Sequence, residues 1–190
     1  MLIDINTYIG HFPFRQVKNM TPSELFKLMN EAGIDMAAVS NMNSVFYRDP
    51  QQGNEELAEQ AAPYSSRFIP FAIINPSYPG WKKDFLHCIN DLGFKGLELY
   101  PYYHQYELNS PECAELVKLA GEMGIPVHLP CAIENIRQRH WMDVNENLSE
   151  GQVDALLNLC PDTDIIITNG ATSGIAQTLA KSSAGRKGRV

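Results

Sequence analysis

The chain has 190 residues, of which 44% are hydrophobic and 19% charged, the composition of an ordinary globular protein with one sizeable core. Its net charge of −7 disfavours nucleic acid and anionic membrane surfaces as partners, so we expect a small-molecule substrate and leave a homo-oligomer open. No apolar run approaches the roughly 20 residues of a bilayer span, and no signal-peptide pattern precedes the first strand. These features favour a cytoplasmic protein.

The chain alternates predicted strands and helices from its first residues onward. In the opening strand, residues 2–9, apolar and polar side chains alternate from Ile3 to Thr7, which places Asp4, Asn6 and Tyr8 on one face. Further strands are predicted at 34–40, 68–74, 94–101, 125–130 and 164–170 with its loop, helices at 21–33, 54–62, 81–92, 110–124 and 149–159, and a polar loop at 41–53. Six strands separated by helices predict β/α units and a parallel sheet.

The number of predicted strands is smaller than a closed barrel requires. An eight-stranded barrel of such units takes about 250 residues. We therefore predict an incomplete TIM-barrel-like (β/α) fold with about six parallel strands over residues 1–170. Residues 171–190 read as a weak helix near 175–180 and a basic Ser/Gly/Lys/Arg tail, for which disorder is favoured over an anion-binding arm. The four separated cysteines predict neither a disulfide framework nor a zinc knuckle.

Three phrases of the sequence point to a family. Asp4-Ile5-Asn6-x-Tyr8-x-Gly10, the phrase at 93–101 and the phrase at 123–127, in this order, resemble the amidohydrolase-related branch of the amidohydrolase superfamily. The resemblance covers most of residues 1–170 and implies a metal-dependent hydrolase on a TIM barrel. It also implies zinc or another divalent metal as cofactor. The family's histidine positions are occupied here by Asn6, Tyr8, Pro130 and Asn169, so no metal ligand is predicted.

The polar residues near the predicted strand ends supply the site candidates. The predicted catalytic residues are His128, Glu98 and His140, and the predicted substrate-binding residues are Asn6, Tyr8, His11, Arg15, Tyr100, Arg137 and Asn169. His128 is either a general base or single metal ligand tuned by Glu98, or a core histidine that this carboxylate satisfies. His11 and Arg15 either bind a carboxylate or phosphate, or belong to a surface turn.

Two further segments carry the same kind of alternative. Glu134, Arg137 and His140 would share one face if their connection is helical, as an anionic-substrate site or as a solvated ion-pair face. The tyrosines at 100–106 either wall a pocket or bury a loop.

Three functional hypotheses follow from these residues and from the resemblance. The first is an amidohydrolase-related hydrolase of C–N or ester bonds, or a decarboxylating lyase, acting on a small carboxylated substrate. The second is a non-catalytic barrel fragment that binds a small molecule or a partner. The third is a sugar-isomerase-like barrel, for which Glu98 and His128 are the supporting residues.

Overall fold

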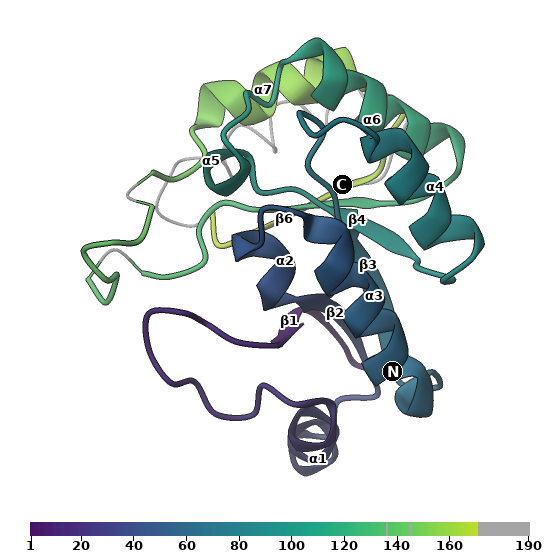
Figure 1. Cartoon of the computed structure of the whole chain (residues 1–190), viewed down its shortest axis with the longest axis vertical. Coiled ribbons are helices and arrows are strands. Elements are labelled where there is room, and N and C mark those ends of the chain that lie inside the picture. The colour runs from purple at the N-terminus through teal and green to yellow at the C-terminus, as the bar shows by residue number, and fades with distance from the viewer. Residues whose placement is uncertain (136, 145, 171–190) are drawn as a thin grey trace. The chain divides into compact units, whose positions relative to one another are not determined.

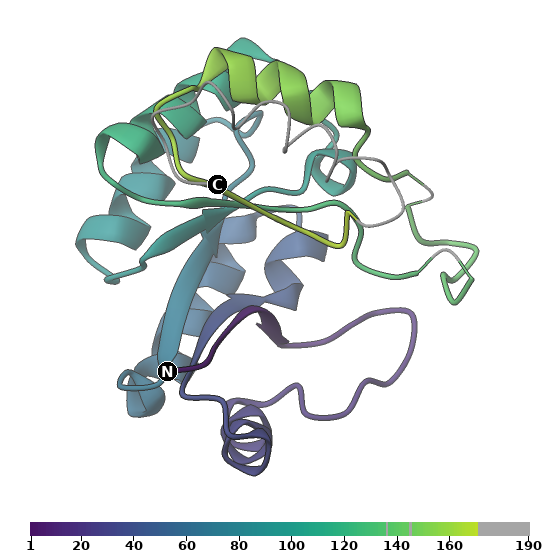
Figure 2. The same ribbon diagram turned by 180° about the vertical axis from the view of Figure 1, so that it is seen from behind.

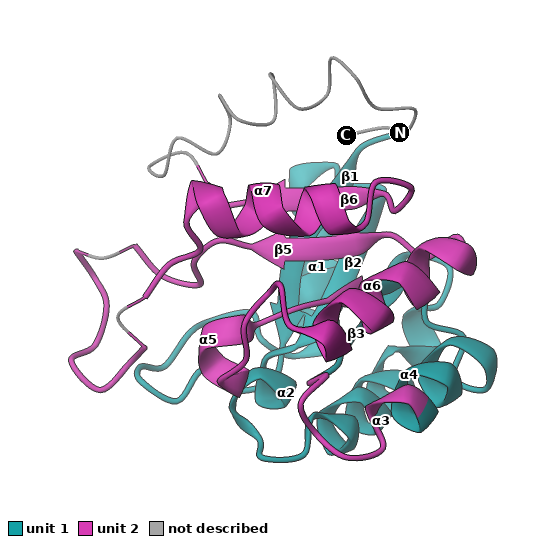
Figure 3. Ribbon diagram, turned by 90° about the horizontal axis from the view of Figure 1, so that it is seen from above, with its two compact units in different colours: residues 1–74, 83–96 teal, residues 75–82, 97–190 magenta. Residues whose placement is uncertain are grey.

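The computed structural model describes residues 1–135, 137–144 and 146–170, which contain six strands alternating with helices (Figure 1). The chain divides into two compact units (Figure 3). Unit 1 is Met1–Ile74 with Lys83–Gly96, and unit 2 is Asn75–Lys82 with Leu97–Val190. The sequence predicts one domain over residues 1–170, and both units contain parts of that range. The domain boundary at residue 170 stays a prediction. The predicted helix near 175–180 and the basic tail lie outside the described residues.

Unit 1 is built on three parallel strands. They are β1 (Ile3–Ile9), β2 (Met36–Asn41) and β3 (Phe68–Ile73), hydrogen-bonded in that order. The accompanying helices are α1 (Pro22–Ala32), α2 (Met42–Phe46), α3 (Pro50–Ala61), the short 3-10 helix η1 (Ala62–Tyr64) and most of α4 (Trp81–Asn90). Helix α3 packs on β2 and β3. The core side chains Ile9, Val39, Leu57, Ile73 and Phe85 are fully buried there.

Short polar residues at helix starts explain where the helices of unit 1 begin. Thr21 forms a capping box with Glu24, and Pro22 occupies the first turn of the helix predicted at 21–33. The predicted polar loop at 41–53 is wrong, because it contains α2 and the start of α3. Asn41 and Asp49 accept hydrogen bonds from the backbone two residues on and act as their caps.

Unit 2 repeats the strand–helix order with three more parallel strands. They are β4 (Gly96–Glu98, which begins at the unit boundary), β5 (Val127–Pro130) and β6 (Ile165–Thr168), with β5 in the centre. The helices are α5 (Pro101–His104), α6 (Pro111–Glu122) and α7 (Glu150–Leu159). Helices α6 and α7 lie on one side of these strands (Figures 1 and 2). The fully buried Leu97, Leu116, Leu129 and Leu156 belong to the core of this unit.

The strand predicted at 94–101 is longer than the strand that forms. Strand β4 ends at Glu98, and Pro101 begins helix α5. Proline lacks the N–H that a strand ladder needs but suits the first turn of a helix, so the aromatic segment turns away from the sheet. Ser110 and Ser149 cap α6 and α7, at the starts of the helices predicted at 110–124 and 149–159.

The six strands are parallel to their neighbours within each unit and alternate with helices. The predicted fold class, an incomplete TIM-barrel-like (β/α) fold with about six parallel strands, is therefore confirmed. Among the described residues, no helix is both long enough and apolar enough to cross a bilayer.

Candidate functional site

Unit 2 brings three chemically active side chains together at the ends of its strands. Glu98 closes β4 and is in register with His128 of β5. Thr168 closes β6 and is in register with Pro130, two residues beyond His128. Because side chains two residues apart on a strand share a face, the register brings the three onto the same face of the sheet.

His128 contacts an acidic group on one side and a hydroxyl on the other. Its Nδ1 lies 3.1 Å from Glu98 Oε1, and its Nε2 lies 2.8 Å from Thr168 Oγ1. The Tyr100 hydroxyl donates a 2.8 Å hydrogen bond to the same Glu98 oxygen. Glu98 is 0% and His128 2% exposed, so the two groups satisfy each other in a place that water does not reach.

These contacts hold the imidazole ring between a carboxylate and a hydroxyl. The tautomer decides which ring nitrogen donates: when Nδ1 donates to Glu98, Nε2 accepts from the Thr168 hydroxyl. In that tautomer the ring can take a proton from a hydroxyl group, as a general base does.

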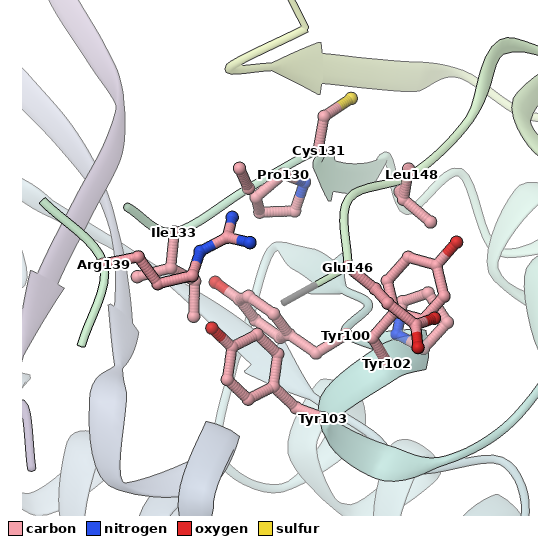
Figure 4. Close-up of a pocket in the computed structure, with 11 residues that line it drawn as sticks. Tyr100, Tyr102, Tyr103, Pro130, Cys131, Ile133, Arg139, Glu146 and Leu148 are labelled. Atoms are coloured by element: carbon pink, nitrogen blue, oxygen red, sulfur yellow. The ribbon is translucent and has the colours of Figure 1, made fainter. Parts of the chain in front are cut away.

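A hollow lies next to this group in unit 2, and we call it the tyrosine hollow (Figure 4). It is lined by Tyr100, Pro101, Tyr102, Tyr103, Pro130, Cys131, Ala132, Ile133, Arg139, Glu146 and Leu148. Tyr100 connects the hollow to the buried Glu98–His128 pair. Its side chain lines the hollow, and its hydroxyl donates a hydrogen bond to Glu98. The tyrosines at 100–103 thus wall a pocket, as one of the two alternatives predicted.

Hydrogen bonds fix the polar side chains around the tyrosine hollow. Arg139 Nη2 donates to Asn147 Oδ1 at 2.5 Å and to the Glu134 carbonyl at 3.4 Å. Tyr103 donates to Asp143 at 2.9 Å. In Figure 4 the Tyr100 and Tyr103 hydroxyl groups end on the side of the hollow where Arg139 lies. A guanidinium beside aromatic rings is suited to a planar anion.

Burial keeps the weak acids of the hollow protonated. It raises the pKa of Tyr103, and the neighbouring carboxylate of Asp143 adds to that effect. Burial likewise raises the pKa of the Cys131 thiol to about 11. Both groups are therefore neutral near pH 7, and Tyr103 remains a hydrogen-bond donor.

The predicted residues of β1 lie in unit 1 and bond to each other. The Tyr8 hydroxyl donates to Asn6 Oδ1 at 2.9 Å, and the Asn6 backbone N–H donates to Asp4. Asn6 and Tyr8 share a face of the strand, as the alternation predicts. Their role in binding a substrate stays a prediction.

His11 and Arg15 lie on the exposed loop that follows β1. The loop is closed by a Gly10 N–H bond to the Met20 carbonyl and by a His11 N–H bond to Asn43. The Arg15 guanidinium lies over the Phe12 ring, 5.9 Å from its centroid. No described contact joins His11 to Arg15, and their anion-binding role stays a prediction.

The face predicted from Glu134, Arg137 and His140 does not form, because the described part of that connection contains turns and no helix. Asn135 Oδ1 accepts from the Arg137 backbone N–H, a local bond that competes with helix formation. Arg137 is exposed, whereas His140 packs beside Trp141, with ring centroids 5.6 Å apart, and its Nδ1 accepts from the Met142 backbone. The catalytic role of His140 stays a prediction.

Asn169 follows directly after Thr168 and is exposed. It has a left-handed backbone with φ of 59°, and its amide donates to the Ala132 carbonyl at 2.7 Å. This bond joins the loops after β5 and β6. It places Asn169 next to Ala132, which lines the hollow, and the contact of Asn169 with a substrate stays a prediction.

Sequence reasoning missed Thr168 and Arg139. Thr168 could have been found, because it ends the sixth predicted strand and a parallel sheet places strand ends together. Arg139 stands two residues after Arg137 in an irregular connection, where no periodicity indicates which arginine points inward. Only the tertiary structure distinguishes the two.

The residues at the family's metal positions do not fit a divalent ion. Zinc takes thiolate, imidazole or carboxylate donors, whereas Asn6 and Tyr8 bond each other and Pro130 has no donor side chain. Across residues 1–135, 137–144 and 146–170, no three His, Cys, Asp or Glu side chains gather as metal ligands would.

The fold and the polar strand ends define a β/α protein of the amidohydrolase type, and comparison with known proteins identifies the family. The amidohydrolase family model, Amidohydro_2, matches residues 5–184. The chain therefore belongs to the amidohydrolase family.

Solved structures of low sequence identity share the fold. 2,6-Dihydroxybenzoate decarboxylase from Rhizobium is 16% identical with a TM-score of 0.66, over 87% of this chain and 65% of that protein. 5-Carboxyvanillate decarboxylase from Sphingomonas paucimobilis is 12% identical with a TM-score of 0.68, over 100% and 76%. 4-Oxalomesaconate hydratase from Rhodopseudomonas palustris is 14% identical with a TM-score of 0.64, over 97% and 68%. The chain thus spans about two-thirds of the length of such proteins.

Proposed function

We propose that this chain is an amidohydrolase-related hydrolase of ester or C–N bonds whose substrate is a small carboxylated molecule. The observation that carries the proposal is the buried Glu98–His128 pair, which shares Tyr100 with the tyrosine hollow. The carboxylate orients the imidazole, and the imidazole faces a hydroxyl with its second nitrogen. This is the arrangement of a general base.

Arg139 and the tyrosines account for the proposed carboxylate. The Arg139 side chain lines the hollow and is hydrogen-bonded to Asn147. Because this bond already restricts the side chain, binding an anion costs it less conformational entropy. Its planar guanidinium pairs with a carboxylate through parallel N–H bonds, and tyrosine rings pack against a flat ligand. A small carboxylated aromatic molecule has both features, and because the hollow has a volume of about 20 Å³, it must widen to admit the ring.

Decarboxylation is the second candidate, and the structural neighbours favour it. Two of them are named as decarboxylases of 2,6-dihydroxybenzoate and 5-carboxyvanillate. In this reaction the carbon–carboxylate bond breaks, carbon dioxide leaves with the carboxyl carbon, and the ring carbon takes a proton. His128, in its protonated form, is the group proposed to supply that proton.

Binding and turnover of two aromatic acids test the proposal. Purified protein is titrated calorimetrically with 2,6-dihydroxybenzoate and with 5-carboxyvanillate, and the products of these acids and their phenyl esters are followed by chromatography. We expect binding that the Arg139→Gln variant weakens by about 10–100-fold, the loss typical of one charge-assisted hydrogen bond.

Arg137→Gln is the matched control, because Arg137 is an exposed arginine of the same connection and does not line the hollow. Its affinity should equal that of the unmodified protein. Equal losses in the two variants would contradict the assigned carboxylate site. Binding without any turnover of acids or esters would support the non-catalytic alternative instead.

A further inference from the structure

We infer that Glu98, His128 and Thr168 form a relay for covalent acyl transfer in which the Thr168 hydroxyl is the nucleophile. The inference rests on the hydrolysis proposed above and adds its reacting group. The substrate class is an ester or activated amide of a small carboxylated acid. No metal takes part in the reaction as inferred.

The distances match those of a nucleophile, a base and an orienting acid. Thr168 Oγ1 lies 2.8 Å from His128 Nε2, and His128 Nδ1 lies 3.1 Å from Glu98 Oε1. Both fall within hydrogen-bond reach, and the three residues lie on three adjacent strands of unit 2, where Glu98 ends β4 and Thr168 ends β6. A hydroxyl bonded to an imidazole that a carboxylate orients is the general signature of an activated nucleophile.

Other threonines of the chain show what a structural hydroxyl does. Thr7 donates to the Ala38 carbonyl at 2.6 Å, and Thr163 donates to the Val117 carbonyl at 3.1 Å. Both satisfy backbone groups, as most side-chain hydroxyls do. Thr168 differs, because its hydroxyl contacts a ring nitrogen that can accept its proton.

The position of Thr168 also suits attack on a bound substrate. Its side chain is half-buried, whereas Glu98 and His128 are buried behind it. Its register partner Pro130 lines the tyrosine hollow together with Tyr100, which bonds Glu98. The hollow therefore reaches the relay through Pro130, the register partner of Thr168, and through Tyr100, which bonds Glu98.

The reaction balances without a co-reactant other than water. Thr168 Oγ1 bonds to the acyl carbon while its proton passes to His128 Nε2, and the bond to the leaving group then breaks as His128 protonates that group. Water attacks the resulting Thr168 ester and gives a proton to His128. The acyl–oxygen bond breaks, the carboxylic acid leaves, and the proton returns to the Thr168 oxygen. Glu98 stays ionised and is a positioning residue throughout.

Acylation by 4-nitrophenyl acetate tests the relay in the full chain. Nitrophenolate release is recorded by stopped-flow absorbance, and intact-mass and peptide mass spectrometry locate any acetyl group. We expect a burst of about one nitrophenolate per chain and an acetyl group on Thr168. Thr168→Val, which keeps the shape and removes the hydroxyl, should lose the burst and the adduct, and Thr168→Ser should retain both.

Two further variants separate the relay from general effects on the fold. His128→Gln should slow acylation by about 10²–10⁴-fold, the contribution of a general base. Glu98→Gln should change the pH profile of acylation while the adduct stays on Thr168. Thr163→Val removes a structural hydroxyl of the same unit and should acylate at the unmodified rate.

The outcomes keep the relay and the proposed function apart. An acetyl group elsewhere, no acylation of the unmodified chain, or an unchanged burst in Thr168→Val overturns the relay. If Thr168→Val still hydrolyses the carboxylated phenyl esters, the relay fails and the proposed function stands. Acylation of Thr168 without turnover of any carboxylated substrate supports the relay and contradicts the proposed substrate class.

Discussion

The two units carry polar clusters at the ends of their strands, and these clusters differ in chemistry. In unit 1, Glu56 Oε2 accepts from the side-chain amides of Asn41 and Asn43, and Asn41 also donates to the Gly53 carbonyl. In unit 2, the corresponding place holds a carboxylate, an imidazole and a hydroxyl that bond one another. The strand ends of unit 1 thus carry an amide-rich cluster, and those of unit 2 carry a cluster of a carboxylate, an imidazole and a hydroxyl.

This difference shows how polarity at strand ends can serve either folding or chemistry. The amides of unit 1 hold loops in place: Asn43 Oδ1 also accepts from the His11 backbone, and Asn41 caps α2. An amide cannot exchange a proton near pH 7, whereas an imidazole can. We therefore expect substitutions in unit 1 to affect stability, and those in unit 2 to affect both stability and reactivity.

The largest expected loss of stability comes from Glu98→Ala. Removing the carboxylate leaves His128 Nδ1 and the Tyr100 hydroxyl without this acceptor, and we expect the free energy of unfolding to fall by about 2–5 kcal/mol, from about 1–3 kcal/mol for each buried donor. Urea denaturation followed by circular dichroism measures the change. Glu56→Ala is the matched change in unit 1, with an expected loss of about 1 kcal/mol because Glu56 is half-buried. Equal losses of unfolding free energy in the two variants would contradict the expected difference between the units.

The Asn54→Ala variant tests an amide of unit 1 that serves folding alone. Asn54 is fully buried and pairs with both backbone groups of Ile73, donating to the carbonyl at 2.9 Å and accepting from the N–H at 3.0 Å. We expect a loss of about 1–3 kcal/mol and faster hydrogen exchange at the Ile73 amide. Gln60→Ala, at an exposed position of the same helix, should change neither. An unchanged exchange rate at the Ile73 amide would contradict a stabilising role for the two Asn54–Ile73 hydrogen bonds.

Helix caps should contribute equally in the two units. Thr21 and Ser149 each form a capping box, with Glu24 and Gln152 as partners. Thr21→Ala and Ser149→Ala should each lower the free energy of unfolding by about 1 kcal/mol, measured by urea denaturation. Ser66→Ala, at an exposed position outside any helix, is the control. A much larger loss at one cap would show that the units differ in more than their strand ends.

The smallest expected effect is on the rate of thiol alkylation. This measurement probes the accessibility of Cys131 in the hollow and requires no substitution. Burial raises the pKa of Cys131 to about 11 and that of Cys88, in unit 1, to about 12. Both thiols are protonated at pH 7, and the reactive thiolate fraction grows about tenfold per pH unit below the pKa.

Iodoacetamide labelling with peptide mass spectrometry should therefore accelerate with pH and reach Cys131 before Cys88. A carboxylated ligand in the tyrosine hollow should slow labelling at Cys131, which lines it, and leave Cys88 unchanged. Rapid labelling of Cys131 at pH 7 would disagree with its burial.

Local patterns predicted most elements of the fold. The Thr21-Pro22 and Ser110-Pro111 starts were readable because a cap depends on side chains within three residues. The Asp49-Pro50 start of α3 follows the same rule, so the loop predicted at 41–53 was an avoidable error. The end of β4 was harder to place, since the apolar run through Leu99 and Tyr100 continues past the ladder.

The candidate site could be predicted in part. Glu98 and His128 lie on consecutive strands of the β/α order, which predicts that they are neighbours in a parallel sheet, and the structure makes them register partners. Arg139 and the bond between Asn169 and Ala132 lie in irregular loops, where contacts join residues far apart in sequence. No local sequence pattern predicts contacts between residues of two irregular loops.

The sequence by itself determined the β/α order, the family and the absence of histidines at Asn6, Tyr8, Pro130 and Asn169, because caps, hydrophobic period and residue identity are local properties. The tertiary structure alone decided that both nitrogens of His128 are occupied, by Glu98 and by Thr168. It also decided which arginine lines the hollow. The partners of His128 and the position of Arg139 depend on strand register and on loop packing. Both are determined by contacts between residues that are far apart in the sequence.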